Sequence, residues 1–211
     1  MISEMLSYDF IQRAFLGGVL VSLCAALLGV SLVLKRYSMI GDGLSHVSFG
    51  ALSIAIACGI APLKFAIPVV IVAAFLLLRL AENGKMRSDA AIAMVSASSL
   101  AIGVIVTSLT TGLSTDIYSY MFGSILAMSK DDVVVSGLLS VIVIIMFVAC
   151  YHKIFAVTFD ENFSKATGVK VGMYNTLISI FTAITIVVGI KMMGAMLISS
   201  LIVFPSLTSM R

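Results

Sequence analysis

Two side chains that could bind a metal ion, Asp42 and His46, stand four positions apart in a largely apolar part of the chain. Residues spaced i and i+4 share one face of an α-helix, so a helix here would bring the carboxylate and the imidazole together. Such a pair suits a divalent cation such as Zn²⁺, Mn²⁺ or Fe²⁺. Two ligands make only half of a site, so other side chains or water would have to complete it.

A structural role for the same two residues is the competing interpretation. Asp42 could cap a helix N-terminus after Gly41, and His46 could hydrogen-bond a neighbouring helix. If the helix begins near Tyr37, His46 lies roughly 14 Å along it, near the middle of a bilayer. The only other histidine, His152, falls in an expected loop. The depth of His46 in the membrane and the small number of histidines favour the metal-binding interpretation, because ionisable residues at membrane depth are usually functional.

The surroundings of this pair are those of a membrane protein. Of the 211 residues, 61% are hydrophobic and 11% are charged, and the mean hydropathy is +1.18. Soluble domains carry roughly 25% charged residues. The apolar segments lack the alternation of barrel strands, so they predict spanning helices. We therefore expect an all-α fold, a multi-pass transmembrane bundle forming a single domain over residues 1–211.

About seven segments are long enough to be expected as spanning helices. An eighth apolar stretch, 117–128, is too short to cross and is expected to form a re-entrant or interfacial helix. The seven expected spans are 14–34, 38–60, 63–80, 89–110, 132–150, 173–190 and 193–208.

The basic residues indicate how these segments are oriented. Lys and Arg in short loops are retained on the cytoplasmic side of a membrane. We therefore expect the N-terminus outside, because that orientation places nine of the 13 basic residues in the cytoplasm. These nine are Lys35, Arg36, Arg79, Lys85, Arg87, Lys153, Lys165, Lys170 and Arg211.

The longest connection on that side, from Tyr151 to about Gly172, has room for structure of its own. Asp160 and Glu161 begin a short stretch that ends at Gly168. Acidic residues at the start and a glycine stop predict a short helix. A solvated loop that only connects two spans is the open alternative.

Several activities lack their sequence motifs. The only Gly-Lys pair, Gly84-Lys85, is followed by Met86 and has Arg79 where a phosphate-binding loop needs its first glycine. There is no His-Glu-x-x-His zinc motif and no Lys/Arg run of the nucleic-acid-binding kind. We expect neither ATP hydrolysis by this chain alone nor a nucleic-acid partner.

Four stretches, in order along the chain, resemble the membrane permeases of ABC-type divalent metal importers, the ABC-3 family, which take up zinc, manganese or iron in bacteria. The first and the last carry the most specific likeness. The four stretches are Lys35–His46, Ser88–Ala91, Asp116–Leu126 and Val188–Leu197 followed by Pro205.

The resemblance implies roles for particular residues. Asp42 and His46 would line the path of the transported metal. Residues 158–172 would form the segment that couples the permease to its ATPase, with small residues at Ala166 and Gly168 docking there. The residues expected to take part in this coupling are Asp160, Glu161, Ala166 and Gly168.

The resemblance also implies an assembly in the bacterial plasma membrane. Two copies of the permease would enclose the path, an extracellular metal-binding protein would deliver the ion, and separate cytoplasmic ATP-binding subunits would drive transport. The divalent metal is then cargo, with zinc favoured over manganese or iron, and no tightly bound cofactor is expected. Family members continue with further membrane helix beyond Arg211, so we expect the chain to be truncated at its C-terminus.

Two other classes of protein stay open at this point. A membrane-embedded metalloenzyme could use Asp42 and His46 to hold a catalytic ion, although the sequence shows no third protein ligand and no general base. A secondary metal carrier without an ATPase is the other, and the long connection before Gly172 argues modestly against it.

Overall fold

The computed structural model describes residues 8–35, 37–82, 88–110, 122–123 and 130–209. The nine elements found in these residues are all α-helices, which confirms the expected fold class. They are α2 (Asp9–Leu34), α3 (Ser38–Ala57), α4 (Pro62–Glu82), α5 (Ser88–Leu109), α7 (Lys130–Ala149), α8 (Tyr151–Phe159), α9 (Glu161–Ala166), α10 (Val171–Met193) and α11 (Ala195–Ser209).

Each of the seven segments expected to span coincides with one of these helices. Among the described helices, α2, α3, α5 and α10 are long and apolar enough to cross a membrane, and α7 with α8 adds a fifth span if this pair, bent by 71°, is counted as one. The apolar parts of α4 and α11 are shorter, and each helix contains an internal proline, Pro68 and Pro205. The expected helix over 117–128 falls almost entirely outside the described residues and stays a prediction.

The connection after α7 is more ordered than we expected. Helix α8 occupies its first part, where we expected loop, and it buries Ile154, Val157 and Thr158. The spacing of these three residues, i, i+3 and i+4, is the pattern of a helix with one apolar face. The polar neighbours His152 and Lys153 obscured that pattern.

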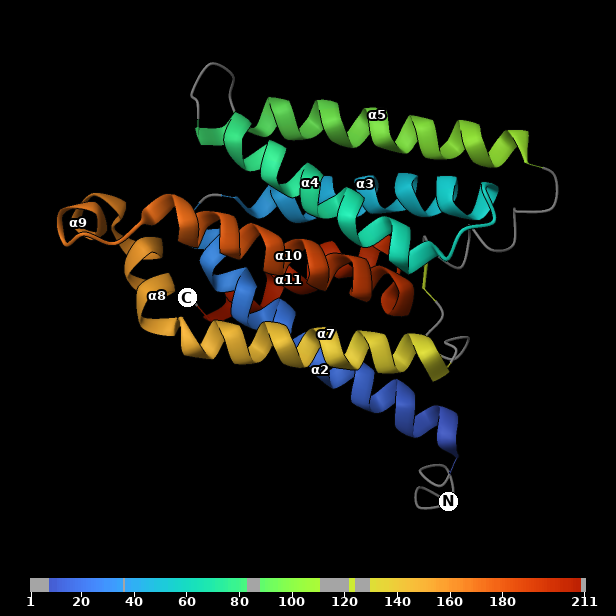
Figure 1. Cartoon of the computed structure of the whole chain (residues 1–211), viewed down its shortest axis with the longest axis horizontal. Coiled ribbons are helices and arrows are strands. Elements are labelled where there is room, and N and C mark those ends of the chain that lie inside the picture. The colour runs from blue at the N-terminus through green and yellow to red at the C-terminus, as the bar shows by residue number, and fades with distance from the viewer. Residues whose placement is uncertain (1–7, 36, 83–87, 111–121, 124–129, 210–211) are drawn as a thin grey trace.

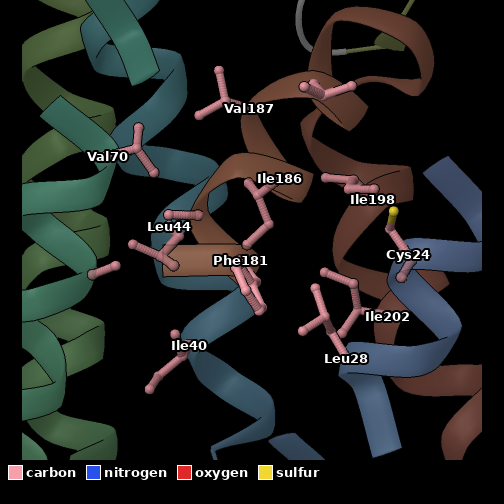
Figure 2. Packing of buried hydrophobic residues seen from close by; sticks show 14 of the residues in the cluster. Cys24, Leu28, Ile40, Leu44, Val70, Phe181, Ile186, Val187, Ile198 and Ile202 are labelled. Carbon is pink, nitrogen blue, oxygen red and sulfur yellow. The ribbon is translucent and has the colours of Figure 1, made fainter. Parts of the chain in front are cut away.

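One apolar core joins the central helices. Figure 2 shows buried side chains from α2, α3, α4, α10 and α11 converging: Cys24, Leu28, Ile40, Leu44, Val70, Phe181, Ile186, Val187, Ile198 and Ile202. In α10, 67% of the apolar 18-residue stretch is buried inside the bundle, against 17% of the corresponding stretch in α5. Helix α10 is therefore central, whereas most of α5 faces outward.

Several helix ends meet at one end of the bundle (Figure 1). In Figure 1 the ends of α2 and α4, the starts of α3, α5 and α10, and both α8 and α9 lie at the same end of the bundle. The described basic residues at this end are Lys35, Arg79, Lys153, Lys165 and Lys170. This arrangement agrees with the expected side for the basic residues, while the orientation in the membrane stays a prediction.

Helix α3 is held closely against α5. A Cβ atom added at Gly50 would lie 2.8 Å from the Ser99 carbonyl oxygen, and one added at Gly103 would lie 2.7 Å from the Phe49 ring. Such contacts allow no side chain larger than hydrogen at either position, as in closely packed membrane helices. The backbone of α3 is therefore fixed on this side.

Candidate functional site

Helix α3 positions both candidate metal ligands. It begins at Ser38 after Tyr37, so Asp42 is its fifth residue and does not cap its N-terminus. The capping alternative for Asp42 is therefore wrong. Within the part of the chain that the structure describes, His46 makes no hydrogen bond to a neighbouring helix, and its contact partner is Asp42 itself.

The two side chains lie close without bonding each other directly. His46 Nε2 is 3.8 Å from Asp42 Oδ2, and the side chains are 26% and 50% exposed, respectively. This separation exceeds the usual hydrogen-bond range. It is shorter than about 4.2 Å, the length of two zinc–ligand bonds placed end to end, so both atoms can reach one ion. The pair can serve as two ligands of a divalent cation.

The pair is also incomplete. No group of three or more His, Cys, Asp or Glu side chains that could hold a metal occurs among the described residues. The nearby Ser45 hydroxyl donates to the Asp42 carbonyl at 2.7 Å, so that donor is committed to the backbone of α3. Any further His, Cys, Asp or Glu ligand must come from another chain or from residues outside the described ranges, and water can fill other positions.

The expected short helix before Gly168 is present as α9. The Asp160 carboxylate accepts a hydrogen bond from the Phe163 N–H at 2.9 Å, which caps the start of the helix. Gly168 ends it with φ +81, and the N–H groups of Gly168 and Val169 donate to the carbonyls of Lys165 and Ser164. These bonds form a Schellman motif, in which glycine is favoured because of its positive φ.

Glu161 belongs to a polar cluster that local sequence patterns did not reveal. Its Oε1 lies 2.7 Å from Lys35 Nζ and 3.2 Å from Asn175 Nδ2. Burial alone would raise the pKa of Glu161, but the hydrogen bonds from Lys35 and Asn175 and the charges of Lys35 and Lys165 outweigh it and lower that pKa. Glu161 is therefore a paired carboxylate, in addition to being the first residue of α9.

The surface of α9 carries the other expected coupling residues. Ala166 and Gly168 are both exposed, and a Cβ atom at Gly168 would meet nothing within 4 Å. Phe163 is 63% exposed on the same helix. Phe163 is a further candidate for this surface, because an exposed aromatic residue within a short polar helix is a signal for an interface. The expected coupling residues thus lie on α9 and at its two ends. The candidate metal ligands Asp42 and His46 lie on a different helix, α3.

Relatives of known description resemble nearly the whole chain. A probable metal transport system membrane protein of Treponema pallidum is 35% identical over 208 residues, covering 98% of this chain and 77% of the relative. The high-affinity zinc uptake system membrane protein ZnuB of Buchnera aphidicola is 31% identical, covering 96% and 78%. The manganese import system permease protein ScaB of Streptococcus gordonii is 26% identical, covering 96% and 72%.

A solved structure shares the fold. It is described as PsaBC from Streptococcus pneumoniae in complex with Fab, and its matching chain is 26% identical with a TM-score of 0.86. The match covers 100% of this chain and 77% of that one. In addition, residues 7–211 match the ABC 3 transport family. The resemblance seen in the sequence is thereby confirmed: the chain belongs to the ABC 3 transport family and is a multi-pass membrane transport subunit, not an enzyme.

Proposed function

We propose that this chain is the permease of an ATP-driven importer of divalent metal ions, with zinc as its favoured cargo. The observation that carries the proposal is the Asp42–His46 pair, two metal-ligand side chains 3.8 Å apart on one face of an apolar helix. Ionisable side chains within membrane helices mark ion pathways more often than structural contacts. Membership of the transport family favours this function over a metalloenzyme or a secondary carrier.

The permease acts as a homodimer in this proposal. One copy supplies two ligands, and a structural zinc site needs four. A twofold axis beside α3 would bring two Asp42–His46 pairs together and supply the missing ligands from a second copy. The half-exposed Asp42 side chain supports this arrangement, because it leaves the carboxylate accessible to an ion.

Transport requires that the ion be bound and then released. The Asp42 carboxylate attracts the cation by its charge, and neutral His46 offers a ring-nitrogen lone pair. An extracellular metal-binding protein delivers the ion, and a cytoplasmic ATP-binding subunit docks on α9 through Ala166, Gly168 and the neighbouring Asp160 and Glu161. Movement of helices against each other separates the ligands and frees the ion toward the cytoplasm.

Zinc is favoured over manganese or iron on the basis of the ligands and the likeness to zinc importers. Imidazole suits zinc well, whereas purely oxygen sites suit harder ions. A relative described as a zinc uptake protein, at 31% identity, supports zinc, and a manganese relative at 26% identity keeps the comparison open to test.

Uptake of radioactive zinc and manganese by the complete transporter tests this function. The permease, ATP-binding subunit and metal-binding protein are reconstituted together, with an ATPase-inactive complex as the matched control. We expect ATP-dependent accumulation of both ions, with zinc taken up faster at equal concentration. Faster manganese uptake would overturn the zinc preference alone, whereas an assembled complex that accumulates no divalent metal would overturn the function.

A further inference from the structure

Lys35 is a buried lysine at the junction between two membrane helices. It follows α2 as its C-cap, and its side chain is only 5% exposed. A buried ammonium is costly unless it is paired with an opposite charge and hydrogen-bonded. The position of Lys35 therefore depends on its partners.

Those partners come from two distant parts of the chain. Lys35 Nζ donates to Glu161 Oε1 at 2.7 Å and to Asn175 Oδ1 at 2.6 Å. Asn175 Nδ2 donates to Glu161 Oε1 at 3.2 Å, which closes a triangle of contacts. Asn175 is 3% exposed and belongs to the central helix α10. We call Lys35, Glu161 and Asn175 the junction cluster.

The junction cluster gives α9 a long-range connection. The principal tertiary contacts of α9 are with α8 and α10, its neighbours along the chain. The bond between Lys35 and Glu161 instead links residues 126 positions apart. It joins the first residue of α9 to the end of α2.

On the other side of Lys35, the chain leads directly into α3. That helix begins at Ser38, three positions later, and the turn is closed by a hydrogen bond from the Tyr37 N–H to the Leu32 carbonyl at 2.8 Å. Asp42 lies about 6 Å farther along the helix axis at 1.5 Å per residue. Lys35 therefore stands only three positions before the helix that carries the metal ligands.

We propose that Lys35 is a positioning residue for transport, whose contacts with Glu161 and Asn175 tie the coupling helix α9 to the start of the metal-path helix α3. This inference rests on the proposed function, in which α9 docks on the ATP-binding subunit. Movement of α9 on nucleotide binding or hydrolysis pulls on the junction cluster and so changes the position of Asp42 and His46. The cluster is the physical element that both sites can bias.

The test measures metal transported per ATP hydrolysed in the complete reconstituted transporter. Lys35→Met keeps an apolar side chain of similar reach but removes the charge, and Glu161→Gln keeps hydrogen-bonding atoms but removes the attraction. We expect each variant that assembles with the ATP-binding subunit to lower the ratio by about fivefold or more. Lys153→Met, at an exposed lysine of the same end, is the matched control and should keep the wild-type ratio.

The double variant Lys35→Met/Glu161→Gln separates this role from direct contact of Glu161 with the ATPase. If both residues act through one contact, the double variant lowers the ratio no further than the stronger single variant. Multiplied effects, or an unchanged ratio in either assembled single variant, would overturn the proposal. If Lys35→Met does not assemble, Glu161→Gln alone decides by its ratio. The proposed function is judged separately, by uptake through the wild-type transporter.

Discussion

The Asp42–His46 pair and the junction cluster are two small polar groups that differ in how completely their bonds are satisfied. His46 and Asp42 lie 3.8 Å apart, and one of the two side chains is half exposed. Lys35, Glu161 and Asn175 instead form bonds of 2.6 to 3.2 Å, and two of the three side chains are almost fully buried.

This difference matches what each group has to do in the proposed transporter. A pair that must bind and then release an ion benefits from unfilled coordination, because its own atoms are not already bonded to each other. A cluster that must transmit movement benefits from satisfied bonds, because buried polar groups without partners are costly. The same chain therefore places an open polar group within α3 and a closed one at the junction that leads into it.

Loss of either metal ligand should have the largest effect. In the proposed function, His46→Ala or Asp42→Ala removes half of the ligands that one copy contributes. Removing a protein ligand leaves the ion with too few bonds to compete with water. We expect uptake to fall at least about tenfold, since metal affinity falls 10–100-fold even when only supporting residues are lost. Radiometal uptake, with immunoblots for permease and ATP-binding subunit, measures this loss.

Asp42→Asn is the control for this prediction. Asparagine is nearly the same size as aspartate but is neutral and a weaker metal ligand. We expect Asp42→Asn to assemble normally and still to lose most uptake. Near-normal uptake by this variant, with loss of folded protein in Asp42→Ala, would make the aspartate structural and place the metal path elsewhere.

A change at Gly168, at the end of α9, should have an intermediate effect on coupling to the ATPase. The φ of +81 at Gly168 strains the backbone of any residue with a branched side chain. An added Cβ atom would meet nothing within 4 Å, so a loss of coupling in a Gly168 variant would not come from a clash with neighbouring residues. We expect Gly168→Val to cost about 1–2 kcal/mol and so to loosen the end of α9 by a factor of about 5–30. ATPase stimulation by the metal-loaded binding protein should fall several-fold.

Gly168→Asn is the matched variant, because asparagine adopts positive φ more readily than other residues. It should retain most of the stimulation. If both variants behave alike, the backbone conformation at this position does not matter, and α9 is only a connector.

The sequence predicted the helices well because their signal is local. Runs of apolar residues sufficient to cross a bilayer lie between basic and glycine-containing turns, and each expected span became a helix. The cap at Asp160 and the stop at Gly168 are also local signals, and both predicted α9 correctly. Likewise, the i and i+4 spacing alone placed Asp42 and His46 on one face.

The junction cluster could not be predicted in this way. Lys35 looked like an ordinary interfacial lysine after a spanning segment, and its burial depends on residues 126 and 140 positions away. Asn175 lies between Tyr174 and Thr176 near the start of an apolar segment, and no spacing there points to a partner. Long-range pairs of single residues leave no periodic pattern, so their contacts appear only once the helices are packed.

The smallest effect is expected from acid, and it concerns the charge on Glu161. The pKa of Glu161 is lower in the folded protein than its ordinary value of 4.5, so the folded state binds fewer protons than the unfolded state in that range. Its pairing therefore stabilises the fold above about pH 4.5, and this stabilisation is lost as the pH falls through the folded pKa. Because the side chain is 40% exposed, we expect this pairing to contribute no more than about 1 kcal/mol to the free energy of unfolding.

Thermal unfolding of the purified permease, measured at decreasing pH from neutral, should show a steeper loss of stability in acid for the wild type than for Glu161→Gln. Parallel losses of stability would mean that the carboxylate of Glu161 is not paired with Lys35. The junction cluster would then no longer differ from the Asp42–His46 pair in having a bonded carboxylate.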